Sequence, residues 1–160
     1  MDFQLININN SISIKNEMRE ILNCNDFSKE YGLILSKEQV LDIINTKNNS
    51  LKDNGRVEFD KSVISLIIKE FCSSNYIEAV KYVETINELI ELFYYYKSET
   101  FDILTDDELI EYMKDEFNGK CQGSIDLLYK KLDKITDNLH NGLPAYYNDD
   151  FKEEDDYEDK

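Results

Sequence analysis

Residues 36–55, SKEQVLDIINTKNNSLKDNG, contain the signals that decide the fold. Ser36 and Gln39 have the spacing of a capping box, in which the serine oxygen accepts a hydrogen bond from a free backbone N–H group and the glutamine reaches back. Apolar residues then recur at helical spacing. Asn54-Gly55 closes the segment, because glycine readily adopts the left-handed conformation that follows many helices. The stretch predicts an amphipathic helix between Ser36 and Asn54.

The same kinds of signal recur in the second half of the chain. Thr105 and Glu108 form another capping box, and Asn118-Gly119 ends the helix that they open. Ser124 opens the last helix, which Asn141-Gly142 ends. Both segments carry apolar residues with helical periodicity, so we expect two further amphipathic helices.

Three more helices are predicted from apolar periodicity together with a start signal or a turn. The first covers about residues 14–23, and the second follows Asp60. The third is the longest element: it starts at Asn75-x-x-Glu78, runs to about residue 98, and has Val80 facing inward. By contrast, residues 3–9 alternate loosely between apolar and polar, like a short strand or an extended arm.

These patterns predict an all-α protein. With 160 residues, only one proline and five glycines, the chain leaves little room for long loops. We expect residues 13–144 to form a single domain, an irregular bundle of about five amphipathic helices plus one or two short ones. Residues 1–12 would form an extended N-terminal arm. Residues 145–160 are predicted to form a disordered acidic tail, because residues 148–160 are mostly charged and lack an apolar period.

The charge of the chain restricts its partners. Thirty-four acidic residues against 18 basic ones give a net charge of −16, which opposes direct binding to nucleic acid or to an anionic membrane. A basic partner is compatible with this charge. No apolar run reaches the roughly 18 residues that cross a bilayer, and residues 1–4 lack the pattern of a signal peptide, so we expect a cytoplasmic protein.

Cys121 is the one candidate for a catalytic residue. It lies in a glycine-flanked loop before a helix N-terminus, where Lys120 and the helix dipole would lower a thiol pKa or hold an anion. His140, the only histidine, lies at the far end of that helix, which excludes a Cys–His pair within one chain. The alternative is a helix connection with a small buried thiol. The residues of the candidate loop are Gly119, Lys120, Cys121, Gln122, Gly123 and Ser124.

No metal or cofactor site is predicted. Residues 50–61 resemble a calcium-binding EF-hand loop, but Lys61 stands where a bidentate carboxylate is needed. A dinuclear bundle site needs two Glu-x-x-His pairs, and the chain has a single histidine. Acidic stripes, including Glu84, Glu88 and Glu91 on the longest predicted helix, are interpreted as a solvated face, with a basic partner or a divalent cation as the alternatives.

A run of aromatic residues near the end of the longest predicted helix suggests an interface. Four consecutive aromatic side chains point all round a helix, so they cannot all face one core. Either the helix is central and packed on several sides, or part of the run contacts another molecule. The interface candidates are Phe93, Tyr94, Tyr95, Tyr96 and Phe101.

Several segments together are similar to a family of small bacterial proteins of unknown function, of about 160 residues and found mainly in Firmicutes. They are Tyr31-Gly32-Leu33, Asn54–Phe59, Asn87–Tyr95, Asp106–Ile110 and Phe117–Ser124, and they span roughly residues 20–130. The resemblance implies a bacterial cytosolic protein. It implies no activity, substrate, cofactor or functional residue.

Two functional hypotheses follow from these features. The first is a non-enzymatic acidic module, an adaptor or a self-associating protein, that binds a protein partner or a second copy of itself through the aromatic end of its long helix. The second is a small enzyme or ligand-binding protein that uses the loop around Cys121.

Overall fold

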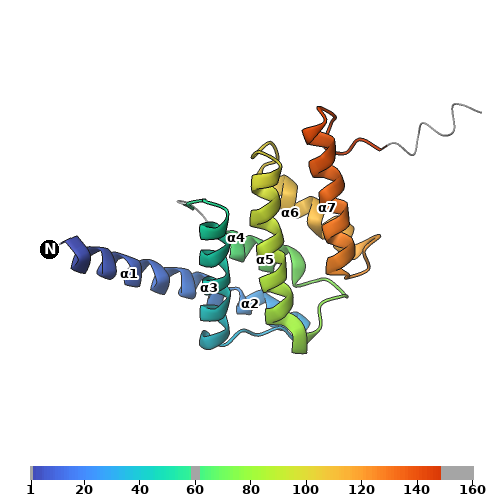
Figure 1. Ribbon diagram of the computed structural model, residues 1–160. Helices are drawn as coiled ribbons and strands as arrows, with labels where there is room; N and C mark the ends of the chain where they lie inside the picture. Colours follow the sequence, from blue (N-terminus) through green and yellow to red (C-terminus); the bar gives the residue numbers. More distant parts are fainter. Residues whose placement is uncertain (1, 59–61, 149–160) are drawn as a thin grey trace, which may run out of the picture.

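The computed structural model describes the backbone of residues 2–58 and 62–148, and their side chains from Ile12 onward (Figure 1). The α-helices are α1 (Asp2–Asn23), α2 (Asn25–Ser28), α3 (Lys37–Asp53), α4 (Val63–Phe71), α5 (Tyr82–Glu99), α6 (Asp106–Asn118) and α7 (Ile125–His140). Two short 3-10 helices, η1 (Lys29–Tyr31) and η2 (Ala79–Lys81), lie between them. The described residues contain no strand, which confirms the all-α class.

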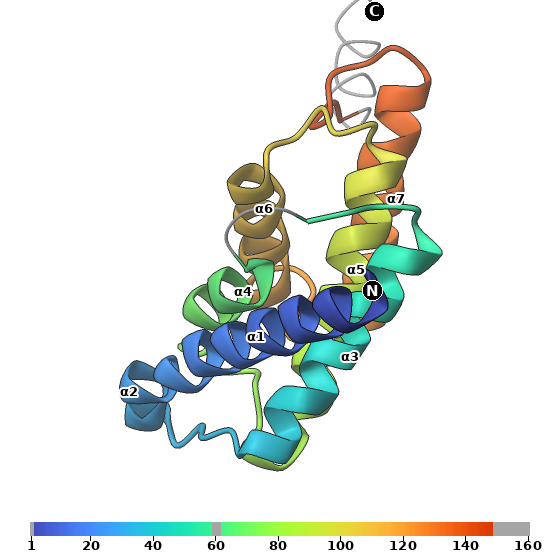
Figure 2. The same ribbon diagram turned by 90° about the vertical axis from the view of Figure 1, so that its left-hand side faces the viewer.

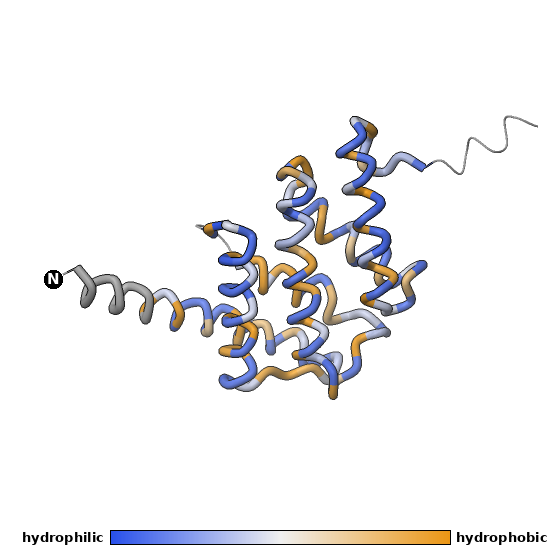
Figure 3. Tube along the Cα trace, in the orientation of Figure 1, coloured by the Kyte–Doolittle hydropathy of each residue, from blue (hydrophilic) through white to orange (hydrophobic). Residues whose placement is uncertain are grey.

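Helix α5 lies at the centre of the molecule. It packs against α3, α4, α6 and α7, and α3 and α7 stand on either side of it (Figure 1). Helices α4 and α6 also pack against each other, and α1 crosses α3, as the turned view shows (Figure 2). Apolar and polar residues alternate along the helices, as amphipathic elements around one core require (Figure 3).

This central position explains most of the aromatic run on α5. Phe93, Tyr94 and Tyr96 are buried within the single chain because they face different neighbouring helices. The Tyr94 hydroxyl donates to Glu58 Oε1 at 3.0 Å, and Glu58 also pairs with Lys47 of α3 at 3.5 Å. The buried hydroxyl therefore has a partner, as buried polar groups require.

The helix caps predicted at Ser36, Thr105 and Ser124 are confirmed. Gln39 N donates to Ser36 Oγ at 3.2 Å and Ser36 N to Gln39 Oε1 at 2.9 Å, so both halves of the capping box form. The box at Thr105 and Glu108 has the same two bonds. At the start of α7, Leu127 N donates to the Ser124 hydroxyl at 3.2 Å.

The predicted start of the longest helix is wrong. Helix α5 begins at Tyr82, and residues 74–78 form a turn in which the Ser74 hydroxyl accepts from Tyr76 N at 3.2 Å. Such side-chain bonds to the backbone compete with helix formation. As a result Val80, predicted to face inward, is 90% exposed in η2. Asp60, which precedes the second of the predicted helices, lies outside the described residues. At the start of α4, Glu58 Oε1 accepts a hydrogen bond from Val63 N.

The predicted N-terminal arm is also wrong, because the backbone of residues 2–12 belongs to α1. No strand lies beside this segment, and a helix supplies the backbone hydrogen bonds that an isolated extended chain cannot. At the other end, residues 145–148 are not part of a free tail. Asn138 Nδ2 donates to the carbonyl oxygens of Ala145 and Tyr147 at 3.0 and 2.9 Å. The rest of the predicted tail, residues 149–160, lies outside the described residues.

Candidate functional site

One face of α5 is left open between α3 and α7. Glu84, Glu88, Glu91 and Tyr95 share this face because they follow one another at intervals of three or four residues. The opposite face of the helix packs on α4 and α6. The exposed stripe of α5 therefore forms the floor of a groove with a helix on each side.

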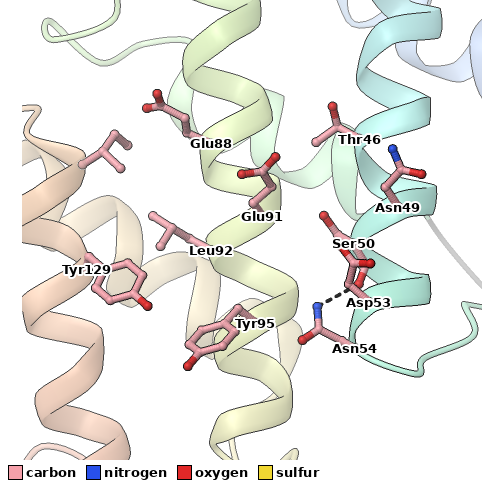
Figure 4. A pocket seen from close by; sticks show the side chains of 11 residues that line it. Thr46, Asn49, Ser50, Asp53, Asn54, Glu88, Glu91, Leu92, Tyr95 and Tyr129 are labelled. Atoms are coloured by element: carbon pink, nitrogen blue, oxygen red, sulfur yellow. Dashed lines mark hydrogen bonds between the residues drawn. The ribbon is translucent and has the colours of Figure 1, made fainter.

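The groove has a volume of about 730 Å³. Figure 4 shows the side chains of its walls and floor: polar groups and the Asp53 carboxylate on the side of α3, the Glu88 and Glu91 carboxylates on α5, and one tyrosine on each of α5 and α7. The groove is lined by Thr46, Asn49, Ser50 and Asp53 of α3 and by Asn54 directly after it, by Glu88, Glu91, Leu92 and Tyr95 of α5, and by Ile125 and Tyr129 of α7. We call this feature the α5 groove.

Two stacked tyrosines form the aromatic part of the α5 groove. The Tyr95 and Tyr129 rings lie 6.3 Å apart between centroids at an angle of 19°, and the residues are 40% and 43% exposed. Beneath them the buried Tyr96 hydroxyl donates to Asp133 Oδ1 at 2.6 Å and to the Tyr129 carbonyl oxygen at 3.2 Å. These bonds tie α7 to α5, so the aromatic surface is fixed before any ligand arrives.

The carboxylates of the α5 groove form no ion pair within the part of the chain that the structure describes. None of Asp53, Glu88 and Glu91 forms an ion pair with a described residue, although other carboxylates of the chain do. Partial burial raises the pKa of Glu88, and Glu84, Glu91 and Asp126 raise it further against a smaller opposite effect of Lys81. The free groove therefore holds concentrated negative charge that a cation would relieve.

A second, smaller pocket of about 230 Å³ continues the α5 groove toward the start of α5. Glu88 and Ile125 line both cavities, so the two are adjacent. The remaining walls come from the turn before η2, from α5 and from the loop before α7. We call this feature the end pocket, and its other lining residues are Tyr76, Glu78, Lys81, Glu84, Thr85, Phe117 and Gly123.

The predicted interface residues lie in three different places. Phe93, Tyr94 and Tyr96 belong to the core, so they offer no surface to a partner. Tyr95 lies in the α5 groove. Phe101 is 65% exposed at the turn after α5, away from the groove, where its ring lies 4.9 Å from that of His140.

The loop before α7 forms part of the wall of the end pocket, but its Cys121 thiol is not accessible as a nucleophile. Cys121 is only 1% exposed, and burial raises the pKa of its thiol, with a further rise from Glu116, so a reactive thiolate is disfavoured. Lys120 and Gln122 are exposed, Gly119 follows the end of α6, and Ser124 caps α7. Gly123 is the loop residue that borders the end pocket.

Tyr129 and Asp53 are among the groove residues that sequence reasoning missed. Asp53 occupies the last turn of a correctly predicted helix, and Tyr129 follows Ile125 by four residues on another. The periodicity of each helix contains this information. Nothing in the sequence, however, shows that α3 and α7 flank the acidic stripe of α5.

The described residues give no support to a metal site or a membrane span. No group of three or more His, Cys, Asp or Glu side chains is arranged to hold a metal ion in the part of the chain that the structure describes. Among the same residues, no helix combines the length and apolar character that crossing a bilayer requires.

A family model for a family of unknown function, DUF6323, matches residues 20–145. The chain belongs to this family. The match covers the last turn of α1, all the other helices and every residue of both cavities, so the α5 groove and the end pocket lie within the part that defines DUF6323. No curated protein and no solved structure matches the chain.

Proposed function

We propose that this protein is a non-enzymatic interaction module of the cytoplasm whose α5 groove binds a basic segment of another protein. The observation that carries the proposal is a set of three carboxylates beside the exposed tyrosine pair. Asp53, Glu88 and Glu91 form no ion pair with any described residue. Carboxylates attract lysine and arginine, and tyrosine gives a large contact area with little loss of entropy. Three free, buried cysteines suit a reducing compartment.

The shape of the α5 groove favours a helical segment. The groove is bounded along its length by α3 and α7, with α5 as its floor (Figure 4). A helix laid along α5 would complete the packing of its open face, as amphipathic helices do in the grooves of other proteins. The bound segment would present basic residues to Glu88 and Glu91 and an apolar or aromatic residue to the tyrosines.

The same charges argue against two other occupants. A second copy would bring one acidic groove against another acidic surface of a chain with a net charge of −16, so self-association at this groove is disfavoured. Nucleic acids and anionic membranes are repelled for the same reason. An enzyme built on Cys121 has no support, because its thiol is buried.

The proposal can be tested with a fluorescent amphipathic peptide of about 18 residues, composed of Leu, Lys and Arg, which is long enough to form a helix. We expect it to bind the wild-type protein, and the double variant Glu88→Lys, Glu91→Lys to bind it at least about tenfold more weakly. Tyr129→Ala should also weaken binding, because the stacked aromatic surface is lost.

Helix α6 offers a matched control for net charge. Glu111 and Asp115 are exposed carboxylates four residues apart on that helix, away from the α5 groove. The double variant Glu111→Lys, Asp115→Lys changes the total charge by the same amount and should keep the affinity of the wild type. Equal losses in the two double variants would show nonspecific attraction and overturn the proposal, as would peptide binding that survives the groove variant.

A further inference from the structure

The end pocket joins aromatic, apolar and acidic groups in a space of about 230 Å³. Glu78, Glu84 and Glu88 supply carboxylates, and Tyr76 and Phe117 supply rings. Lys81 is the only cation among the lining residues. None of the three carboxylates forms an ion pair with a described residue. The pocket is therefore suited to one flat or slender cationic group.

Gly123 allows Tyr76 to pack closely against the loop before α7. Its φ is +79°, and a Cβ atom at this position would lie 2.5 Å from Tyr76 Cβ and 2.9 Å from Cγ. The loop and the aromatic residue can approach this closely only because the loop residue is glycine. On its other side the Tyr76 ring meets Phe117 edge to face, at 6.4 Å between centroids and 89°. The wall of the end pocket is thus fixed by the loop before α7 and by α6.

We infer that the end pocket receives an arginine side chain of the same basic helix that occupies the α5 groove. This inference rests on the proposed function and names the residue type that the partner must carry at one end of its bound segment. A guanidinium group is flat, stacks on aromatic rings and donates to several carboxylate oxygens at once. Lysine carries a single ammonium group, which is strongly hydrated and stacks less well on aromatic rings.

The two cavities lie at a spacing that one helix can span. Glu84 and Glu88 are one turn apart on α5, about 6 Å along its axis at 1.5 Å per residue. Glu91 and Tyr95 continue the same stripe for two further turns. A partner helix running along α5 would therefore place one residue at the end pocket and residues one and two turns away over the α5 groove.

Agmatine, a small amine that carries the guanidinium group of arginine, tests the end pocket without any partner. Titration into the ¹⁵N-labelled protein should shift the amide signals around Tyr76, Glu84 and Gly123 at millimolar concentrations. Glu84→Gln should reduce these shifts, whereas Glu111→Gln on α6 should not. Absence of shifts in this region, or equal shifts from n-butylamine at the same concentrations, would overturn the assignment to arginine.

A pair of helical peptides tests the link to the α5 groove. The two peptides differ only at the residue nearest the end pocket, which is arginine in one and its neutral isostere citrulline in the other. We expect the citrulline peptide to bind about tenfold more weakly to the wild type. In Glu84→Gln the difference should shrink, because the carboxylate charge that would pair with the guanidinium group is gone.

The outcomes separate the two proposals. If neither peptide binds while agmatine shifts the end pocket, the proposed function of the α5 groove fails and the guanidinium site stands alone. If both peptides bind with equal affinity and binding is lost in Glu88→Lys, Glu91→Lys, the groove is supported and the arginine inference is overturned.

Discussion

Arg56 and Asp102 form a two-pronged ion pair that joins the connection after α3 to the turn after α5. Arg56 Nη2 lies 2.6 Å from Asp102 Oδ1, and Nη1 lies 3.1 Å from Oδ2. The turn that they hold contains two successive non-glycine residues with positive φ, 54° at Phe101 and 57° at Asp102. Such conformations cost energy for L-residues and persist only where the surroundings enforce them.

Replacing Asp102 by Asn should remove the charge of this pair while the backbone keeps its conformation, because asparagine tolerates positive φ. The Asp102 side chain is half exposed, so we expect a loss of no more than about 1 kcal/mol of unfolding free energy at neutral pH. Urea unfolding of Asp102→Asn and the wild type measures it. No loss at low salt would show that the pair does not stabilise the turn.

The same pair predicts a pH dependence of known sign. Hydrogen bonding to Arg56 lowers the pKa of Asp102 below its usual 3.8. The folded state therefore binds a proton at Asp102 less readily than the unfolded state. The free energy of unfolding rises as pH increases from the folded-state pKa to the unfolded-state pKa. The contribution is complete above the unfolded pKa and is lost as pH falls through the lower folded value. The stability difference between wild type and Asp102→Asn should thus disappear in acid.

Substitutions of Phe101 test whether the positive φ in the turn after α5 costs folding free energy. Its ring is largely exposed and contacts mainly His140, so its burial contributes little. We expect Phe101→Asn to be more stable than Phe101→Ala by about 0.5–1 kcal/mol, because both lose the ring but asparagine accepts positive φ more readily than alanine. Thermal unfolding of the two variants checks this order. The reverse order would mean that the turn is not strained in solution.

Gly123 and Gly142 form a matched pair of positions with positive φ, 79° and 74°. An added Cβ would collide with Tyr76 at Gly123 and would meet nothing within 4 Å at Gly142. We expect Gly142→Ala to cost about 1 kcal/mol for the backbone alone and Gly123→Ala roughly 1–3 kcal/mol more. Denaturant unfolding of both variants measures the difference. Equal costs would show that Tyr76 does not pack against this loop.

Local signals in the sequence were sufficient for most helix boundaries. The capping boxes at Ser36 and Thr105 were predictable because all their hydrogen bonds connect residues three apart. The start of α5 was not, because the Ser74 hydroxyl competes for the backbone and also donates to Asn118, which is 44 residues away. Helical periodicity alone cannot show such a long-range contact.

The candidate site was only partly predictable for the same physical reason. Glu84, Glu88 and Glu91 share a helix face in any sequence reading, so the acidic stripe could be found. That Tyr95 is exposed while Tyr96 is buried depends on α7, whose Asp133 accepts the Tyr96 hydroxyl. Because a groove is formed between helices, its walls require the tertiary arrangement and not the pattern of one element.

Glu88 should limit stability in the free protein and contribute to binding in the complex. Burial and the like charges of Glu84 and Glu91 raise its pKa above the usual 4.5, so the folded state binds this proton more readily than the unfolded state. The free energy of unfolding therefore falls as pH rises from the unfolded-state pKa to the higher folded-state pKa of Glu88. The destabilisation is fully present at neutral pH. We expect Glu88→Gln to raise the unfolding free energy there by about 0.5 kcal/mol, at a few tenths for each like-charged neighbour.

The gain in stability should vanish below pH 4.5, where Glu88 is protonated in both states and resembles glutamine. The same substitution should weaken binding of the basic amphipathic peptide by roughly three- to tenfold, because one of the unpaired carboxylates is lost. Glu111→Gln on α6 serves as the control and should change neither quantity by a comparable amount. A variant that is more stable and binds the peptide as tightly as the wild type would place the basic segment elsewhere on the surface, since a carboxylate that contacts a cation cannot be neutralised without loss of affinity.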